Sequence, residues 1–332
     1  MMRVAIAMFM LSGGLVSAQQ FYLPTENTSL FLAGNETRFY APTPGKDWVS
    51  GSYGCVRTGG AQFHEGIDIL RVNTDRRGEP TDEVIAAADG IVSYANHASG
   101  ASLYGKYVIL KHRIEGIPVF TLYAHLSLIE SGIRSGAQVR AGAKLGVMGR
   151  TANTRSRIGR DRAHLHFEIA FRANERFSGW YQEQYQGKND HGNWHGWNFL
   201  GLDPTDILRR QVNEAQFSLL NFIRHQKEMF RVLVPKTGFS YEREYRPLMR
   251  RNATAERAGI DGYELVINFA GIPCQLIPRS KTEIPFEKSY SIIRVVEEEA
   301  LSKRCRKLIT KERGKWRLTR KGVEFLDLIT YR

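Results

Sequence analysis

Hydrophobic positions between Gly51 and Ile169 come in short runs that glycine-containing turns separate. A pair such as Asp89-Gly90 between two such runs is typical of a hairpin connection. The runs are Val84 to Ala87, Ile91 to Ala95, Tyr107 to Lys111, Val119 to Tyr123 and Lys144 to Met148. No helical period of useful length lies among them. The pattern therefore predicts an all-β domain, built as an antiparallel β-sandwich or a barrel-like sheet.

One run, Ala163 to Ile169, alternates strictly around a His-x-His pair. Successive side chains of a strand point to opposite faces, so His164 and His166 share one face of the predicted strand. Two imidazoles on one sheet face suit a zinc site in which one binds the metal and the other acts beside it.

The pattern changes after Pro204. Apolar residues between 217 and 230 fit the stripe of a helix from about 205 to 231. The elements expected beyond it are a strand at Gly262 to Phe269, a helix at Ser289 to Leu308, a strand at Trp316 to Leu318 and a helix at Lys321 to Leu328. We therefore expect a helical linker and a smaller α+β domain over residues 208–332.

Composition adds two constraints. The chain has 332 residues, of which 42% are hydrophobic, so it is long enough for two folded domains. Its net charge of +13 favours acidic partners such as nucleic acid, anionic lipid or a polyanionic cell wall. Charge alone does not choose among these partners.

The N-terminus predicts export. Arg3 precedes a short apolar run, Val4 to Met10, and small residues lead to Ala18. This is the pattern of a signal peptide over residues 1–18, with cleavage after Ala18. The alternative is a retained N-terminal anchor, although the run is short for a membrane span. We expect the mature chain in the periplasm or outside the cell, and not as an integral membrane protein.

The three cysteines, Cys55, Cys274 and Cys305, are too few for a disulfide framework. Cys274 and Cys305 both lie in the C-terminal part, so a bridge between them is favoured and leaves Cys55 free or buried. The alternative is that all three are reduced residues of the core.

Several motifs together resemble the lysostaphin/LytM-type zinc metallopeptidases, also called glycyl-glycine endopeptidases. The similarity covers about residues 50 to 207. The motifs are His64-x-x-x-Asp68, Ala88-Asp89-Gly90, Tyr104-Gly105-Lys106-Tyr107-Val108, Tyr123-Ala124-His125-Leu126-Ser127, Gly142 to Gly149 and His164-Leu165-His166-Phe167-Glu168. Their order and spacing match the family. The resemblance implies a zinc metallopeptidase domain over residues 51–207, with a fold like the family's duplicated hybrid motif.

The resemblance also implies roles for five residues. One zinc ion per chain would be bound by His64, Asp68 and His166, with a fourth position open to water. His125 and His164 would be the unligated pair. One of them would take a proton from the water, and the other would stabilise the oxyanion or protonate the leaving amine.

The implied function is that of a secreted or periplasmic zinc endopeptidase that hydrolyses peptide cross-links of peptidoglycan through a zinc-activated water. Two alternatives stay open. Some relatives have lost ligands and regulate wall amidases without catalysis, whereas this sequence keeps every expected ligand. The other alternative is a peptidase that acts on other proteins.

Two segments flank the predicted site. Residues 19–50 contain scattered prolines and asparagines and predict an irregular lead-in, either a surface strand or a linker. Residues 171–202 are rich in tryptophan and tyrosine and predict a long insertion that walls the substrate groove. His191 and His195 lie within it, but a loop without helical signals would not hold them as a metal pair.

The segment Lys303 to Lys321 contains ten Lys or Arg residues and one acid, Glu312. Its helix-strand-helix pattern weakly suggests a winged-helix DNA reader, which the export signal disfavours, so nucleic acid is an unlikely partner. An exported basic face would hold anionic wall or lipid groups. The alternative is a solvated surface with no partner.

Overall fold

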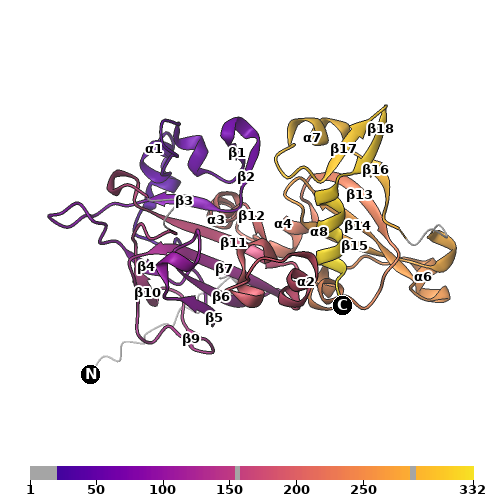
Figure 1. Ribbon diagram of the computed structural model, residues 1–332, viewed down its shortest axis with the longest axis horizontal. Helices are drawn as coiled ribbons and strands as arrows, with labels where there is room; N and C mark the ends of the chain where they lie inside the picture. The colour runs from indigo at the N-terminus through magenta and orange to yellow at the C-terminus, as the bar shows by residue number, and fades with distance from the viewer. Residues whose placement is uncertain (1–20, 154–157, 285–288) are drawn as a thin grey trace, which may run out of the picture.

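The computed structural model describes residues 21–153, 158–284 and 289–332 (Figure 1). The predicted signal peptide, residues 1–18, lies outside these ranges. Within them, no helix has both the length and the apolar character that a bilayer crossing requires.

A seven-stranded antiparallel sheet forms the centre of the N-terminal part. Its strands run in the order β12-β11-β7-β6-β5-β9, and β3 pairs with β11 beside β12. Their bounds are β3 Ile67–Leu70, β5 Gly90–Asn96, β6 Lys106–Ile114, β7 Ile117–Leu126, β9 Gln138–Val139, β11 His164–Arg172 and β12 Phe199–Leu202. The prediction of antiparallel β-structure in this region is confirmed, and the likeness to a duplicated hybrid motif stays a prediction.

Two smaller sheets complete this part. One has the order β4-β10-β8, and the other is a hairpin of β1 and β2. Their bounds are β1 Gly54–Arg57, β2 Gln62–His64, β4 Glu83–Ile85, β8 Leu128–Ile129 and β10 Lys144–Val147. The β1–β2 hairpin pairs with no strand of the large sheet among the described residues, so other contacts must hold it.

The C-terminal part contains a four-stranded antiparallel sheet in the order β15-β14-β13-β16 and a hairpin of β17 and β18. The strands are β13 Glu228–Val234, β14 Gly262–Asn268, β15 Pro273–Arg279, β16 Ser291–Val295, β17 Ile309–Glu312 and β18 Lys315–Leu318. The α-helices of the described residues are α1 Glu36–Phe39, α2 Phe177–Gln184, α3 Pro204–Asn213, α4 Leu219–Arg224, α5 Ser240–Glu244, α6 Ala253–Ala258, α7 Glu297–Ser302 and α8 Arg320–Thr330.

The expected helix from about 205 to 231 is wrong as a single element. Two short helices, α3 and α4, replace it, and the chain then enters β13. Asp203 caps α3 and Ser218 caps α4, so each helix starts anew. Met229 and Phe230 belong to β13, which pairs with β14 and β16 on its two sides. Pairing on both sides outweighs the helical spacing of the apolar residues.

The expected helix from Ser289 to Leu308 is also wrong over most of its length. The chain forms β16 and then the short helix α7. Ile292, Ile293 and Val295 are β-branched, and β16 pairs along β13. The strands expected at Gly262 to Phe269 and Trp316 to Leu318 and the final helix are confirmed as β14, β18 and α8.

One buried apolar cluster contains residues of both predicted domains, from Phe21 to Ile329. Phe171 of β11 packs against Tyr245, with ring centroids 4.6 Å apart. Asn174 donates two hydrogen bonds of 2.8 Å to the carbonyl oxygens of Leu328 and Tyr331, which fixes the end of α8. The two parts therefore share a core, and the boundary near residue 207 stays a prediction.

The lead-in at residues 19–50 is not a surface linker where it is described. Leu30 and Phe39 are buried, and the amide of Ala41 donates to the carbonyl of Asp68 at 2.9 Å. The aromatic segment at 171–202 is likewise not an irregular loop throughout, because it contains α2 and β12. Its aromatic residues supply packing that secures both elements.

The favoured pairing of Cys274 with Cys305 is wrong. Cys55 is bonded to Cys305 across 250 residues of sequence, and Cys274 is a free, buried thiol. Cys274 lies within β15, among the core residues of the four-stranded sheet. The fold brings the β1–β2 hairpin against the C-terminal part (Figure 1). The prediction relied on closeness in sequence, which gives no information about this contact.

Candidate metal centre

The register of two neighbouring strands brings Asp68 and His166 together. In the antiparallel pairing of β3 with β11, Asp68 lies directly opposite His166, and His164 lies opposite Leu70. Residues that face each other across a ladder point to the same side of the sheet. His164 and His166 also share a face, as the alternation of the sequence predicts. Three side chains of the predicted site are thus placed by strand pairing alone.

His64 reaches the same place from the end of β2. A tight connection through Gly66 joins β2 to β3 over the top of β11. A Cβ atom on Gly66 would lie 2.2 Å from the carbonyl oxygen of Phe167, so only glycine fits there. The His-x-x-x-Asp spacing is therefore set by a turn that must pass close to the strand carrying His166.

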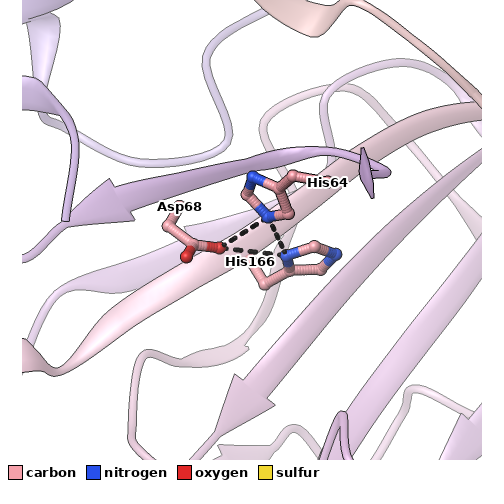
Figure 2. A group of neighbouring side chains, drawn as sticks. All are labelled: His64, Asp68 and His166. Carbon is pink, nitrogen blue, oxygen red and sulfur yellow. Dashed lines mark hydrogen bonds and ion pairs between the residues drawn. The ribbon is translucent and has the colours of Figure 1, made fainter. Parts of the chain in front are cut away.

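His64, Asp68 and His166 form a compact, buried cluster (Figure 2). Asp68 Oδ1 lies 3.2 Å from Nε2 of His64 and 3.0 Å from Nδ1 of His166. The two imidazole nitrogens are 3.1 Å apart. All three potential ligand atoms lie within 4.8 Å of one another. Two imidazole nitrogens and one carboxylate oxygen are a ligand set that suits zinc, so these residues fit the metal.

The outer nitrogen of each histidine has a fixed acceptor. His64 Nδ1 donates to the carbonyl oxygen of Ser52 at 2.7 Å, and His166 Nε2 donates to Oε1 of Glu168 at 2.8 Å. The hydroxyl of Tyr104 donates to the same Glu168 oxygen at 2.7 Å. These bonds direct His64 Nε2 and His166 Nδ1 toward the cluster, the arrangement expected of metal-binding histidines.

The cluster alters the protonation of its members. Burial disfavours the charged form of Asp68, but His164, His64 and His166 lower its pKa well below the usual value. Burial also opposes protonation of His166, yet hydrogen bonds to Asp68 and Glu168 raise its pKa to about 9. The buried Asp68 is therefore held in its charged form, which favours a cation beside it.

His125 and His164 lie beside the cluster, with ring centroids 4.9 Å apart. His125 Nδ1 donates to the carbonyl of Thr151 at 2.8 Å, and His164 Nδ1 donates to the carbonyl of Arg162 at 2.6 Å. A carbonyl oxygen can only accept, so Nε2 keeps the lone pair in each neutral ring. Burial lowers the pKa of both histidines, and that of His125 falls well below its ordinary value.

Sequence reasoning missed Arg57, which contacts the cluster from the end of β1. Its Nη2 donates to Oδ2 of Asp68 at 2.5 Å and lies 3.0 Å from Nε2 of His64. No local pattern marks this arginine. Tyr104, by contrast, begins one of the family-like motifs, and its ring centroid lies 5.4 Å from that of His166.

His191 and His195 stand apart from this cluster. His191 uses both ring nitrogens, at 2.9 Å from the hydroxyl of Tyr94 and at 3.0 Å from the carbonyl oxygen of Ala101. His195 stacks on Phe177, with centroids 5.5 Å apart. His191 therefore ties the aromatic segment to Tyr94 and Ala101, and His195 packs within the segment.

Comparison with known proteins places the chain in a family. Residues 62–178 match the model of Peptidase family M23, a range that includes His64, His125 and His166. The chain is also 33% identical over 96 residues to "Lipoprotein NlpD" of Yersinia enterocolitica, of which it covers 81%. The chain belongs to peptidase family M23. The resemblance to LytM-type peptidases drawn from the sequence is confirmed.

A longer M23 relative is "Murein hydrolase activator NlpD" of Escherichia coli, 33% identical over 131 residues. The match covers 40% of this chain and 27% of that relative, so the chain spans about a quarter of its length.

Two solved structures are similar to part of the chain. The catalytic domain of lysostaphin from Staphylococcus simulans is 22% identical, with 48% of this chain and 87% of that chain covered and a TM-score of 0.29. A zinc-containing peptidase from Vibrio cholerae is 23% identical, with 41% and 37% covered and a TM-score of 0.27.

Proposed function

We propose that this M23 member is an exported zinc endopeptidase that hydrolyses peptide cross-links of peptidoglycan. The observation that carries the proposal is the convergence of five residues from four strands. His64, Asp68 and His166 would hold one zinc ion, and His125 and His164 lie beside them with Nδ1 donating to carbonyl oxygens, which leaves Nε2 as the basic nitrogen. Two further neutral histidines with fixed tautomers suit proton transfer, which a purely structural metal site would not need.

The histidines beside the cluster would move protons. When bound, zinc would supply polarisation of the scissile carbonyl and would acidify water near it. His125 and His164 are neutral at pH 7 because burial lowers the pKa of each. One would accept a proton at Nε2 from the attacking water, and the other would deliver a proton to the leaving amine. The Thr151 and Arg162 carbonyls hold both rings in the required tautomer.

Zinc content and cross-link cleavage by the purified mature chain test the proposal, beside the variants His166→Ala and His125→Ala. We expect about one zinc per wild-type chain, loss of zinc from the His166 variant, and retained zinc without cleavage in the His125 variant. Wild-type protein that binds zinc but leaves every cross-link of purified peptidoglycan intact would refute wall hydrolysis.

A second candidate function is activation of a wall amidase without catalysis. The name of the Escherichia coli relative favours it, whereas the complete set of His64, Asp68 and His166 favours catalysis. The two separate in one experiment, in which the chain is added to a purified wall amidase and to peptidoglycan alone. An activator raises amidase turnover and retains this effect in the His125→Ala variant.

The basic segment from Lys303 to Lys321 is proposed to hold anionic wall or lipid groups. Most of its Lys and Arg side chains are exposed, and Lys311 pairs with Glu297 at 2.7 Å. Lys315 and Arg317 lie on β18, at the outer hairpin of the C-terminal part. Replacing both with glutamate should weaken sedimentation with purified walls at low salt, whereas unchanged sedimentation would remove this role.

A further inference from the structure

The β1–β2 hairpin connects the C-terminal part with the metal centre. It forms its own two-stranded sheet, in which Cys55 lies opposite Phe63. At one end Cys55 is bonded to Cys305, and at the other end Arg57 contacts Asp68. The pairing register shifts between Cys55 and Arg57, so two residues that regular alternation places on one face serve different partners.

Arg57 contacts Oδ2 of Asp68, the oxygen that also lies 3.6 Å from Nε2 of His164. Asp68 Oδ1 is shared with His64 and His166, while Oδ2 accepts the hydrogen bond of Arg57. The Asp68 side chain is 2% exposed and that of Arg57 is 23% exposed. A charge-assisted bond to one carboxylate oxygen fixes the direction of the other oxygen. The same Nη2 lies 3.0 Å from Nε2 of His64, so a metal bound at that nitrogen would leave Arg57 its bond to Oδ2, which orients the carboxylate.

The C-terminal part holds the hairpin by contacts besides the disulfide. The guanidinium of Arg306 lies over the ring of Phe63, 5.1 Å from its centroid. Lys303 lies 5.4 Å from the centroid of Phe269, and that ring contacts both Tyr53 and Phe63 at 6.2 Å. Cation–π contacts gain strength when they are partly desolvated, which applies to the partly buried Arg306 and not to the exposed Lys303.

We infer that Arg57 is a positioning residue for Asp68, and that the C-terminal part keeps it in place through Cys55–Cys305 and Arg306. The C-terminal part is then a component of the metal centre's framework, although it supplies no ligand. This inference rests on the proposed zinc site and deepens it, because it makes metal affinity depend on residues more than two hundred positions further along the chain.

Zinc affinity measured by competition with a chromophoric chelator tests the inference. Arg57→Gln should weaken zinc binding about tenfold, the lower range for loss of an outer partner of a ligand. Arg57→Lys keeps the charge and one donor, so its zinc affinity should lie between those of the wild type and Arg57→Gln. The Cys55→Ser/Cys305→Ser pair should weaken binding in the same direction, and serine is used because free thiols would bind zinc themselves.

The decisive comparison combines these changes. If the disulfide acts through Arg57, adding the serine pair to Arg57→Gln should cause no further loss of zinc affinity. Additive effects, or an Arg57→Gln variant with wild-type affinity, would overturn the inference. A wild-type chain that binds no zinc would instead refute the proposed function.

Folding must be separated from positioning. Asn252→Ala is the matched control, because Asn252 caps α6 in the C-terminal part and its bonds to Pro278 and Glu283 lie outside the hairpin. We expect wild-type zinc affinity in this variant, and a loss there would overturn the inference. If the serine pair does not fold, Arg306→Leu loosens the contact with Phe63 while the disulfide stays.

Discussion

Glu168 accepts the Nε2–H of His166 from two positions along the same strand, at 2.8 Å. Both side chains leave the same face of β11, so the strand itself supplies a ligand and the group that orients it. The alternation of the sequence predicts this shared side. It does not predict that Tyr104 would donate to the same carboxylate oxygen.

Glu168→Ala should weaken zinc binding by about 10- to 100-fold, because His166 loses the acceptor that orients its ring. Tyr104→Phe keeps the bond between His166 and Glu168 and should have a smaller effect. Chelator competition on both variants measures the difference. Wild-type affinity in the Glu168→Ala variant would show that His166 needs no outer partner.

His125 should stay neutral well below pH 6.5, since burial lowers its pKa. The unfolded chain then binds a proton that the folded chain does not, so the free energy of unfolding should fall as pH falls below about 6.5. His125→Gln should reduce this pH dependence. Imidazole NMR signals check the assignment, with exposed His97 for comparison. A His125 signal that titrates at pH 6.5 or above would contradict it.

Asp203→Asn should stabilise the chain at pH 8 and not at pH 4. Burial raises the pKa of Asp203 from 3.8 to about 6, so the folded chain retains its proton more readily than the unfolded chain. Stability is therefore lost as pH rises from 3.8 to 6, by up to about 3 kcal/mol at 1.36 kcal/mol per pKa unit. Asparagine keeps an acceptor for the Thr205 amide at the start of α3. Urea unfolding at both pH values measures the change, and equal effects at the two values would contradict the assignment.

Gly66→Ala should abolish zinc binding or folding, because its Cβ would lie 2.2 Å from the carbonyl oxygen of Phe167. The strand carrying His166 cannot move aside without losing its pairing with β3 and β7. Gly100→Ala is the control, since a Cβ there meets no atom within 4 Å. A stable Gly66→Ala chain that binds zinc would contradict the prediction, because it would show that the turn accommodates a Cβ atom at this position.

The sequence predicted what local alternation determines. The antiparallel strands, the shared face of His164 and His166, and the grouping of His64 and Asp68 with them all follow from short spacings or family-like motifs. Short spacings and motifs could not predict contacts between segments that are far apart in the sequence. Arg57 has no local signal because its role depends on where the β1–β2 hairpin packs, and the partner of Cys55 depends on the same packing.

Wrong helix predictions have a different cause. Apolar residues around Met229 have helical spacing, but β13 pairs on both sides with β14 and β16. The strand then forms backbone hydrogen bonds with a neighbouring strand on each edge. The local residue pattern does not show this pairing, because the partner strands lie elsewhere in the sequence. The same holds for β16, which lies within the predicted helix at Ser289 to Leu308 but pairs along β13 through its β-branched residues.

The bond between Cys55 and Cys305 also constrains the order of biogenesis. In a chain exported from the N-terminus, as we propose, Cys55 would emerge 250 residues before its partner, and Cys274 would emerge in between. In an oxidising compartment, Cys274 would then be available to react with Cys55 before Cys305 is. Burial in β15 raises the pKa of Cys274, which suppresses its reactive thiolate once the four-stranded sheet has formed. We therefore expect correct oxidation to depend on the C-terminal sheet folding before the cysteines pair, so that this late-emerging part would determine the disulfide connectivity of the chain.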